Sequence, residues 1–121
     1  MTYDTIYSDF LSIFKEDTDY LNAIADENAV DNEDGKHIQF GMVVFPYILH
    51  LAKIKDTDKL TKAFNFLEEM LSTQDVMICE IVEFTILENL ISENKNILEY
   101  CRQFMKPRTI QSCHSVENYM M

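Results

Sequence analysis

The chain has 121 residues and a net charge of −11. Its hydrophobic content of 47% excludes a disordered tail, and its length fits one domain with its own core. Two glycines and two prolines are too few for the tight turns of a sheet-rich domain. The acidity argues against direct binding of nucleic acid, which needs a basic surface. Two interpretations stay open: attraction of a basic partner, with mimicry of nucleic-acid charge as a variant, and a merely solvated surface.

The spacing of apolar residues predicts two helices near the N-terminus. Six apolar residues from Tyr3 to Phe14 recur at helical spacing and form one stripe, with Thr2 available as the N-cap. A second, short helix is predicted around Tyr20 to Ala25, after a turn at residues 17–19.

The segment 26–35 is predicted to be a loop because it carries five acidic residues and one large hydrophobic residue, Val30. We tested it as a calcium-binding EF-hand. If Gly35 occupies loop position 6, Val30 falls at position 1 and Gly41 at position 12, where carboxylate ligands are required. A solvated acidic loop is therefore the interpretation that fits.

Four further helices are predicted at residues 38–54, 57–72, 75–92 and 96–105. Pro46 lies inside the first of them and removes a hydrogen bond to the carbonyl of Met42, so this helix should be kinked or begin later than its pattern indicates. The loop between the second and third is so short that these helices must form an antiparallel hairpin. The helix at 75–92 is apolar on most sides, which is typical of a central helix.

These elements predict an all-α fold, an irregular HEAT-like bundle of about five to six antiparallel helices in one domain spanning residues 1–121. Residues 1–35 would supply N-terminal helices and the acidic loop, 36–105 the core helices, and 106–121 a weakly helical tail. Acidity is concentrated before the tail, because residues 1–93 hold six basic against 19 acidic side chains while residues 94–121 hold four against two.

Metal and cofactor chemistry finds no support in the spacing of the candidate residues. The soft metal ligands are Cys79, Cys101, Cys113, His37, His50 and His114. No two of them have the spacing of a zinc site, and the adjacent Cys113 and His114 would diverge in regular structure. Glycine-rich phosphate loops and serine nucleophile motifs are absent as well. We therefore predict no metal and no cofactor.

Acidic residues of the 57–92 hairpin are the candidate binding residues. Glu80 and Glu83 are three apart and share a helix face, whereas Glu88 falls on an otherwise apolar flank. A carboxylate there must be hydrogen-bonded or lie at an opening in the packing. One interpretation is structural, with each glutamate paired to a neighbouring helix end or lysine. The other is a single acidic surface made by Glu68, Glu69, Asp75, Glu80, Glu83 and Glu88.

The hairpin sequence, from Ala63 to Leu71 and from Glu80 to Leu90, resembles small bacterial helical proteins that look like immunity proteins of polymorphic or contact-dependent toxin systems. The resemblance covers about residues 38–105 and consists of packing positions and a few glutamates. It implies a HEAT-like fold and a cognate toxin as partner. An acidic immunity protein suits a basic nuclease-type toxin.

Three functions follow from these observations. The leading hypothesis is a non-enzymatic toxin-binding protein, the second a helical adaptor or regulatory scaffold, and the third a carboxylate-based hydrolase using Glu80, Glu83 or Glu88. The N-terminus shows no basic segment followed by an apolar run, and no uninterrupted apolar stretch approaches the roughly 18 residues that span a bilayer. We therefore expect a cytoplasmic protein that binds neither membrane nor nucleic acid; its oligomeric state is left open.

Overall fold

The computed structural model describes residues 1–120, which form seven helices and no strand. The first two are α1 (Ile6–Ile13) and α2 (Thr18–Glu27), separated by the 3-10 turn η1 (Lys15–Asp17). The third runs without a break through α3 (Lys36–Gln39), the π-helical segment η2 (Phe40–Val44) and α4 (Phe45–Ile54), and the fourth is α5 (Thr57–Ser72). The fifth joins α6 (Val76–Glu80), the π-helical segment η3 (Ile81–Leu87) and α7 (Glu88–Ser92), and α8 (Lys95–Arg102) and α9 (Pro107–Met120) complete the bundle.

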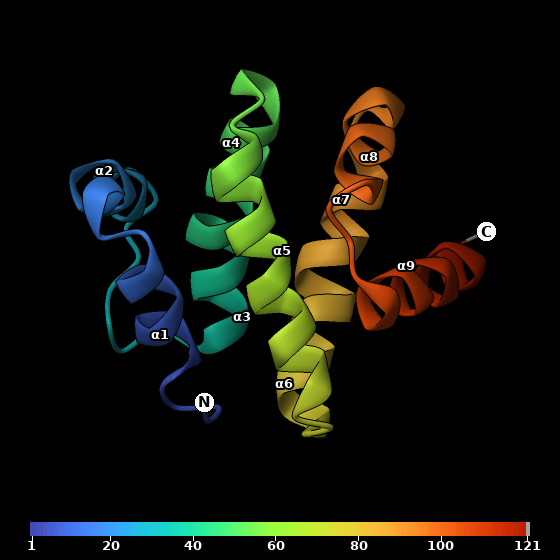
Figure 1. The fold of residues 1–121 in the computed structure, drawn as a ribbon. Helices are drawn as coiled ribbons and strands as arrows, with labels where there is room; N and C mark the ends of the chain where they lie inside the picture. Colours follow the sequence, from blue (N-terminus) through green and yellow to red (C-terminus); the bar gives the residue numbers. More distant parts are fainter. Residues whose placement is uncertain (121) are drawn as a thin grey trace.

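The helices stand in a row (Figure 1), with α1 and α2 at one side, the helices of residues 36–72 in the middle, and α7, α8 and α9 at the other side. The predicted all-helical bundle is confirmed. The expected five to six helices become seven within residues 1–120, because the tail, predicted to be only weakly helical, forms a helix of its own. It forms a regular helix of 14 residues, α9, with Pro107 at its first position, where a missing N–H has no cost.

Aromatic side chains fill the core between α1 and the middle helices. Phe10 is fully buried, and its ring centroid lies 5.0 Å from that of Phe14, 5.4 Å from that of Phe66 and 6.2 Å from that of Phe40. Tyr47 closes the cluster with its ring edge-on to Phe10 and Phe14. These contacts dock α1 onto η2, α4 and α5 at once.

Pro46 does not delay the start of its helix, which begins at Lys36. Instead, the turn before the proline widens into η2, and Pro46 lies at the start of α4. The Met42 carbonyl, which loses its usual donor to the proline, accepts a hydrogen bond of 2.9 Å from the side-chain amide of Asn28. The predicted disturbance at Pro46 is therefore a local π-helical turn inside a continuous helix.

The hairpin of α5 and α6 forms as predicted, because each helix starts at an aspartate. The carboxylate of Asp56 accepts a hydrogen bond from the backbone N–H of Lys59, and the carboxylate of Asp75 accepts from those of Met77 and Ile78. Gln74 takes a left-handed backbone conformation (φ 58°) in the connection between the two helices. Aspartates at N-caps thus fix both helix starts and the short link.

The long helix Lys36–Ile54 is, within residues 1–120, the one helix long and apolar enough to cross a membrane by length and composition. Its most apolar 18-residue window has a mean hydropathy of 1.2, and half of that window is buried inside the domain. Buried core helices pass the same test, and this helix packs against α2, α5 and α8.

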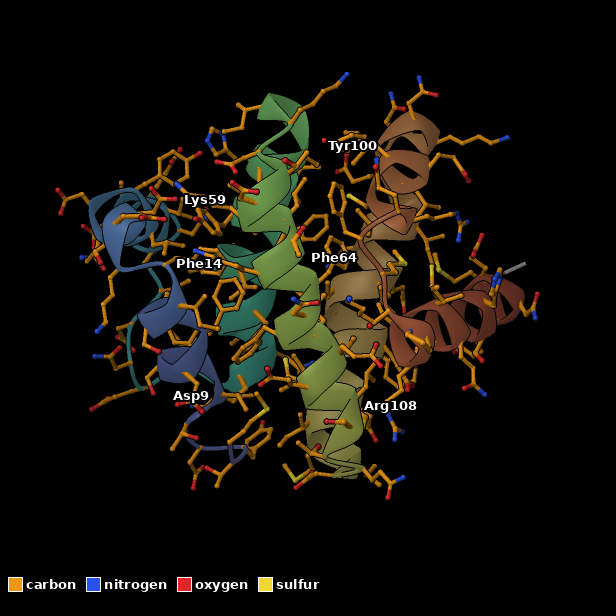
Figure 2. All side chains as sticks on the ribbon, in the orientation of Figure 1. Asp9, Phe14, Lys59, Phe64, Tyr100 and Arg108 are labelled. Carbon is orange, nitrogen blue, oxygen red and sulfur yellow. The ribbon has the colours of Figure 1, made fainter. Side chains whose placement is uncertain are left out.

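A partly buried polar cluster ties η1 to α4 and α5. The carboxylate of Asp17 accepts a hydrogen bond from the hydroxyl of Tyr47 and another, 2.8 Å long, from the ammonium of Lys59. Figure 2 shows Lys59 on α5, beside α2. The hydrogen bond from Lys59, followed by that from Tyr47, lowers the pKa of Asp17 below its ordinary value. Burial, and then the bond to Asp17, raises the pKa of Tyr47, so its hydroxyl stays protonated and donates.

Replacing Asp17 with asparagine is expected to lower the free energy of unfolding by about 1–2 kcal/mol at pH 7, because a charge-assisted hydrogen bond is lost. The folded-state pKa of Asp17 is depressed, so its contribution is present above the unfolded-state value of about 4 and disappears as the pH falls through the folded-state pKa. Urea denaturation should show the difference at pH 7 and a shrinking difference below about pH 4. Asp19→Asn, at an exposed position on α2, is the control, and an equal loss there would contradict the account.

Candidate functional site

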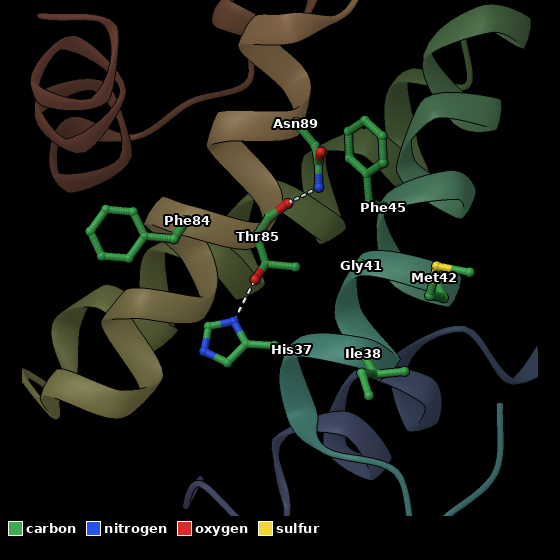
Figure 3. A pocket seen from close by; sticks show the side chains of 8 residues that line it. All are labelled: His37, Ile38, Gly41, Met42, Phe45, Phe84, Thr85 and Asn89. Atoms are coloured by element: carbon green, nitrogen blue, oxygen red, sulfur yellow. Dashed lines mark hydrogen bonds between the residues drawn. The ribbon is translucent and has the colours of Figure 1, made fainter. Parts of the chain in front are cut away.

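An apolar groove of about 530 Å³ lies between the two π-helical segments (Figure 3). One wall comes from α3, η2 and the start of α4, and the other from η3 and α7. The lining residues, called the groove residues below, are His37, Ile38, Gly41, Met42, Phe45, Phe84, Thr85 and Asn89.

Gly41 lets the two walls approach each other at the floor of the groove. A Cβ atom built on Gly41 would lie 3.2 Å from the Cγ2 atom of Thr85, closer than ordinary van der Waals contact. A larger side chain there would push η2 away from η3. π-helical turns are rare and concentrate at functional sites. Because two of them face each other here, the groove is a candidate functional site.

Thr85 joins the two walls through its side chain, and its backbone carbonyl binds a side chain of its own wall. Its hydroxyl is 2.5 Å from the Nδ1 atom of His37 on the opposite wall, and its carbonyl accepts a hydrogen bond of 2.6 Å from the amide of Asn89. Figure 3 shows both bonds, with His37 closing one end of the groove and Asn89 beside Phe45 near the other. The bond between His37 and Thr85 therefore links the two walls at one end of the groove.

Large hydrophobic side chains are exposed at the edges of the groove. Ile38 is 49% exposed, Met42 43% and Phe84 47%. On the helix that carries Phe84, Val76 and Met77 are exposed as well, at 68% and 56%. Exposed apolar side chains that gather on neighbouring helices mark interaction surfaces more often than isolated ones do.

Three of the candidate carboxylates lie on the helix that carries Phe84. Glu80 precedes Phe84 by four residues and Glu88 follows it by four, and both are partly buried. Burial, and then repulsion from Glu80, raises the pKa of Glu83 above its ordinary value. The structure thus brings Glu80 and Glu83 close enough to repel each other, as their spacing predicted.

Glu68 and Asp75 serve instead as caps at helix starts. Asp75 caps α6, as described above, and Glu68 on α5 caps the distant helix α9. The two oxygens of Glu68 accept hydrogen bonds from the backbone N–H groups of Arg108 and Thr109, at 3.1 and 3.0 Å, and from the Thr109 hydroxyl at 2.9 Å. Figure 2 shows Arg108 at the start of α9, beside α5. Glu68, predicted from the sequence to lie on an acidic binding surface, is therefore paired with the end of a neighbouring helix.

Replacing Glu68 with alanine is expected to lower the free energy of unfolding by about 1–2 kcal/mol and to speed hydrogen exchange in the first turn of α9, because a cap is lost. Glu69→Ala is the matched control, since Glu69 is the next residue and is exposed. Urea denaturation and amide exchange at Arg108 and Thr109 provide the measurements. Equal effects of the two substitutions would show that the Glu68 cap contributes nothing.

The remaining candidates leave their carboxylates available. Glu69, Glu80, Glu83 and Glu88 form no ion pair with any residue in the range 1–120. We call these four residues the hairpin carboxylates. Glu69 lies on α5, and Glu80, Glu83 and Glu88 lie on the helix that carries Phe84.

The cysteines are placed for packing rather than for nucleophilic chemistry. Cys101 and Cys113 are fully buried, and burial raises the pKa of each thiol to about 11, so both are protonated at neutral pH. Arg102 fastens α8 to α9 beside Cys113, through a bond of 2.8 Å to Glu117. Among the described residues, no three histidine, cysteine or acidic side chains are grouped so that they could hold a metal ion.

Sequence reasoning missed the groove, because it depends on contacts between residues far apart in the chain. His37 was considered only as a metal ligand, and Thr85 and Asn89 were not considered. One signal was available: an isolated glycine in an apolar helical run, Gly41, is typical of a close approach between backbones.

Residues 7–120 match the model of DUF7674, a domain of unknown function. This chain belongs to the DUF7674 family. The match to DUF7674 runs from α1 to α9 and so includes both walls of the groove and all four hairpin carboxylates. Searches of curated proteins and of solved structures found no match to this DUF7674 chain.

Proposed function

We propose that the domain is a non-enzymatic protein-binding module that engages a basic partner protein through the hairpin carboxylates. The main support is the imbalance of charge on the folded chain. Of 21 acidic side chains, only Glu16, Asp17, Asp56, Glu99 and Glu117 lie within 4.0 Å of a lysine or arginine nitrogen in residues 1–120. A partner that carries lysine or arginine would supply the missing positive charge.

Local electrostatics favour the hairpin over other acidic parts of the chain. Glu83 is partly buried and close to Glu80, so the two carboxylates repel each other at neutral pH. A lysine or arginine placed between them would relieve this repulsion and lower the pKa of Glu83. Exposed acids in the segment 26–35 have no comparable arrangement, and the surrounding water already stabilises them.

A bacterial toxin is the partner class that we propose, and this step rests on the resemblance of the hairpin to immunity proteins. The domain would act in the cytoplasm by covering a basic surface of a nuclease-type toxin. The second candidate is a helical adaptor with a partner that is not toxic. The apolar groove is compatible with both candidates, because it can bind a toxin or a partner that is not toxic.

Co-expression with the product of the neighbouring gene tests the proposal. That product should stop growth when expressed alone, and the domain should restore growth and co-purify with it. The variant Glu69→Gln, Glu80→Gln, Glu83→Gln, Glu88→Gln, called the hairpin variant, should lose both effects. It retains Glu68 and Asp75, so the helix caps of α9 and α6 are unchanged.

A control variant with the same change in net charge separates a local effect from a global one. Asp19→Asn, Asp26→Asn, Glu27→Gln, Glu33→Gln removes four exposed carboxylates from α2 and the loop that follows it. It should protect cells as well as the wild type does. A neighbouring product that is bound but not toxic would favour the adaptor, and one that is neither toxic nor bound would refute the proposal.

A further inference from the structure

We propose that the groove between η2 and η3 seats an amphipathic helix of the partner, whose apolar face enters the groove and whose flanks carry lysine or arginine. This inference rests on the proposed function and names where and how the partner binds. It assigns the groove residues the apolar part of the contact, and Glu80 and Glu88 the charged part.

The dimensions and lining of the groove fit about two turns of a helix. The first wall extends from His37 to Phe45, which corresponds to about 12 Å along a helix axis. An incoming helix of that length presents two or three apolar side chains on one face, at spacings of three and four residues. Met42 and Phe84 both line the groove and are partly exposed, so both are accessible to such side chains.

An extended peptide is a poorer occupant than a helix. Strand addition needs a free sheet edge with unpaired backbone groups, and both walls of this groove are helices whose backbone groups bond along their own axes. The part of the chain that the structure describes has no strand. Recognition must therefore come from side chains that enter the groove, as in other helix-in-groove interactions.

The charge around the groove selects a basic helix and disfavours a second copy of this chain. Glu80 and Glu88 flank Phe84, and none of the groove residues is a lysine or arginine. The Oδ1 atom of Asn89 accepts no hydrogen bond from residues 1–120 and can accept one from a partner's N–H group. A second copy would bring its own net charge of −11 to the same place, and the two would repel each other.

A synthetic peptide tests the inference without the natural partner. The probe is a fluorescein-labelled 14-residue helix with leucines on one face and lysines on the other. Its control is a permuted isomer with the same composition and no apolar face. Fluorescence anisotropy measures Kd, and methyl NMR of the wild-type domain shows whether the signals of Ile38 and Met42 shift. We expect the probe to bind at least tenfold more tightly than the isomer and to shift both signals.

Substitutions at exposed positions complete the test. Met42→Lys and Phe84→Lys should each weaken probe binding at least tenfold, because each puts a positive charge where an apolar contact is expected. Ile54→Lys is the matched control, since Ile54 is 56% exposed at the far end of α4 and the change in charge is the same. Equal weakening by Ile54→Lys, or equal binding of the isomer, would overturn the inference, as would NMR shifts confined to other residues.

The same variants separate the failure of the inference from that of the proposed function. If the neighbouring product binds the wild type, fails to bind the hairpin variant, and binds Met42→Lys and Phe84→Lys normally, the groove is not the docking site while the function holds. If the probe binds the groove but the neighbouring product does not bind the domain, the function fails and the groove remains a helix-binding site. Circular dichroism confirms that each variant is folded before it is used.

Discussion

Replacing Phe10 with alanine is expected to lower the free energy of unfolding by about 3–5 kcal/mol, a large fraction of the stability of a domain this small. Phe10 is fully buried and its ring packs against Phe14, Phe40, Tyr47 and Phe66. Its removal leaves a cavity that these rigid rings cannot fill. Urea denaturation followed by circular dichroism measures the loss.

The control for Phe10→Ala is Ile13→Ala, on the same helix. Ile13 is 38% exposed, so the loss should stay below about 1 kcal/mol. Comparable losses from the two substitutions would mean that α1 is not docked through its aromatic face. Because Phe40 is the first residue of η2, the Phe10 cavity should also loosen the wall of the groove and weaken probe binding.

Raising the ionic strength from about 20 mM to about 500 mM is expected to lower the association rate constant of a basic partner at least about tenfold. The domain carries a net charge of −11, and most of its carboxylates have no ion-pair partner in residues 1–120. Salt screens the long-range attraction that steers a basic partner toward this surface. Stopped-flow fluorescence with the purified partner, or with the lysine-rich probe, measures the rate.

The dissociation rate constant should change much less, because apolar contacts in the groove are not screened by salt. The hairpin variant should lose more of the salt dependence than the control variant, although both have lost four charges. An association rate that is independent of salt would show that the acidity serves solubility alone. That outcome would support the other interpretation, in which the acidic side chains are solvated and bind no partner.

Helices that are specified by residues within or next to them could be predicted from the sequence. The apolar stripe of residues 57–72 and the aspartates before both hairpin helices specify α5 and α6, and the structure has α5 at Thr57–Ser72. Pro46 was identified correctly as a disturbance. Its form was not predicted, because Asn28, which donates to the freed carbonyl of Met42, is 14 residues away in the chain.

Residues 106–121 were judged weakly helical because their own residues carry a mixed pattern. The described part of this segment is a regular helix, and the reason lies outside it: Glu68 caps its start and Arg102 holds Glu117 near its end. The periodicity of apolar residues within a segment does not predict such contacts with distant residues. Residue 121 lies outside the described residues.

The candidate site was predicted only in part. Glu80 and Glu83 do lie together, as their spacing on a helix requires, but η3 is π-helical, so positions beyond Glu83 do not follow the α-helical register used for Glu88. Glu68 and Asp75 were grouped with them by charge, although their carboxylates cap helices. The groove arises from two π-helical turns that face each other, and apart from the isolated Gly41 no pattern within either segment indicates it.

The most direct test of the account is the Kd of the purified partner for the hairpin variant and for the control variant at one ionic strength. Both variants have the same net charge, so any difference reports the location of the carboxylates. We predict that the hairpin variant binds about ten- to hundredfold more weakly than the wild type, and the control variant within about threefold of it. Equal Kd values for the two variants would contradict the claim that the hairpin is the binding surface.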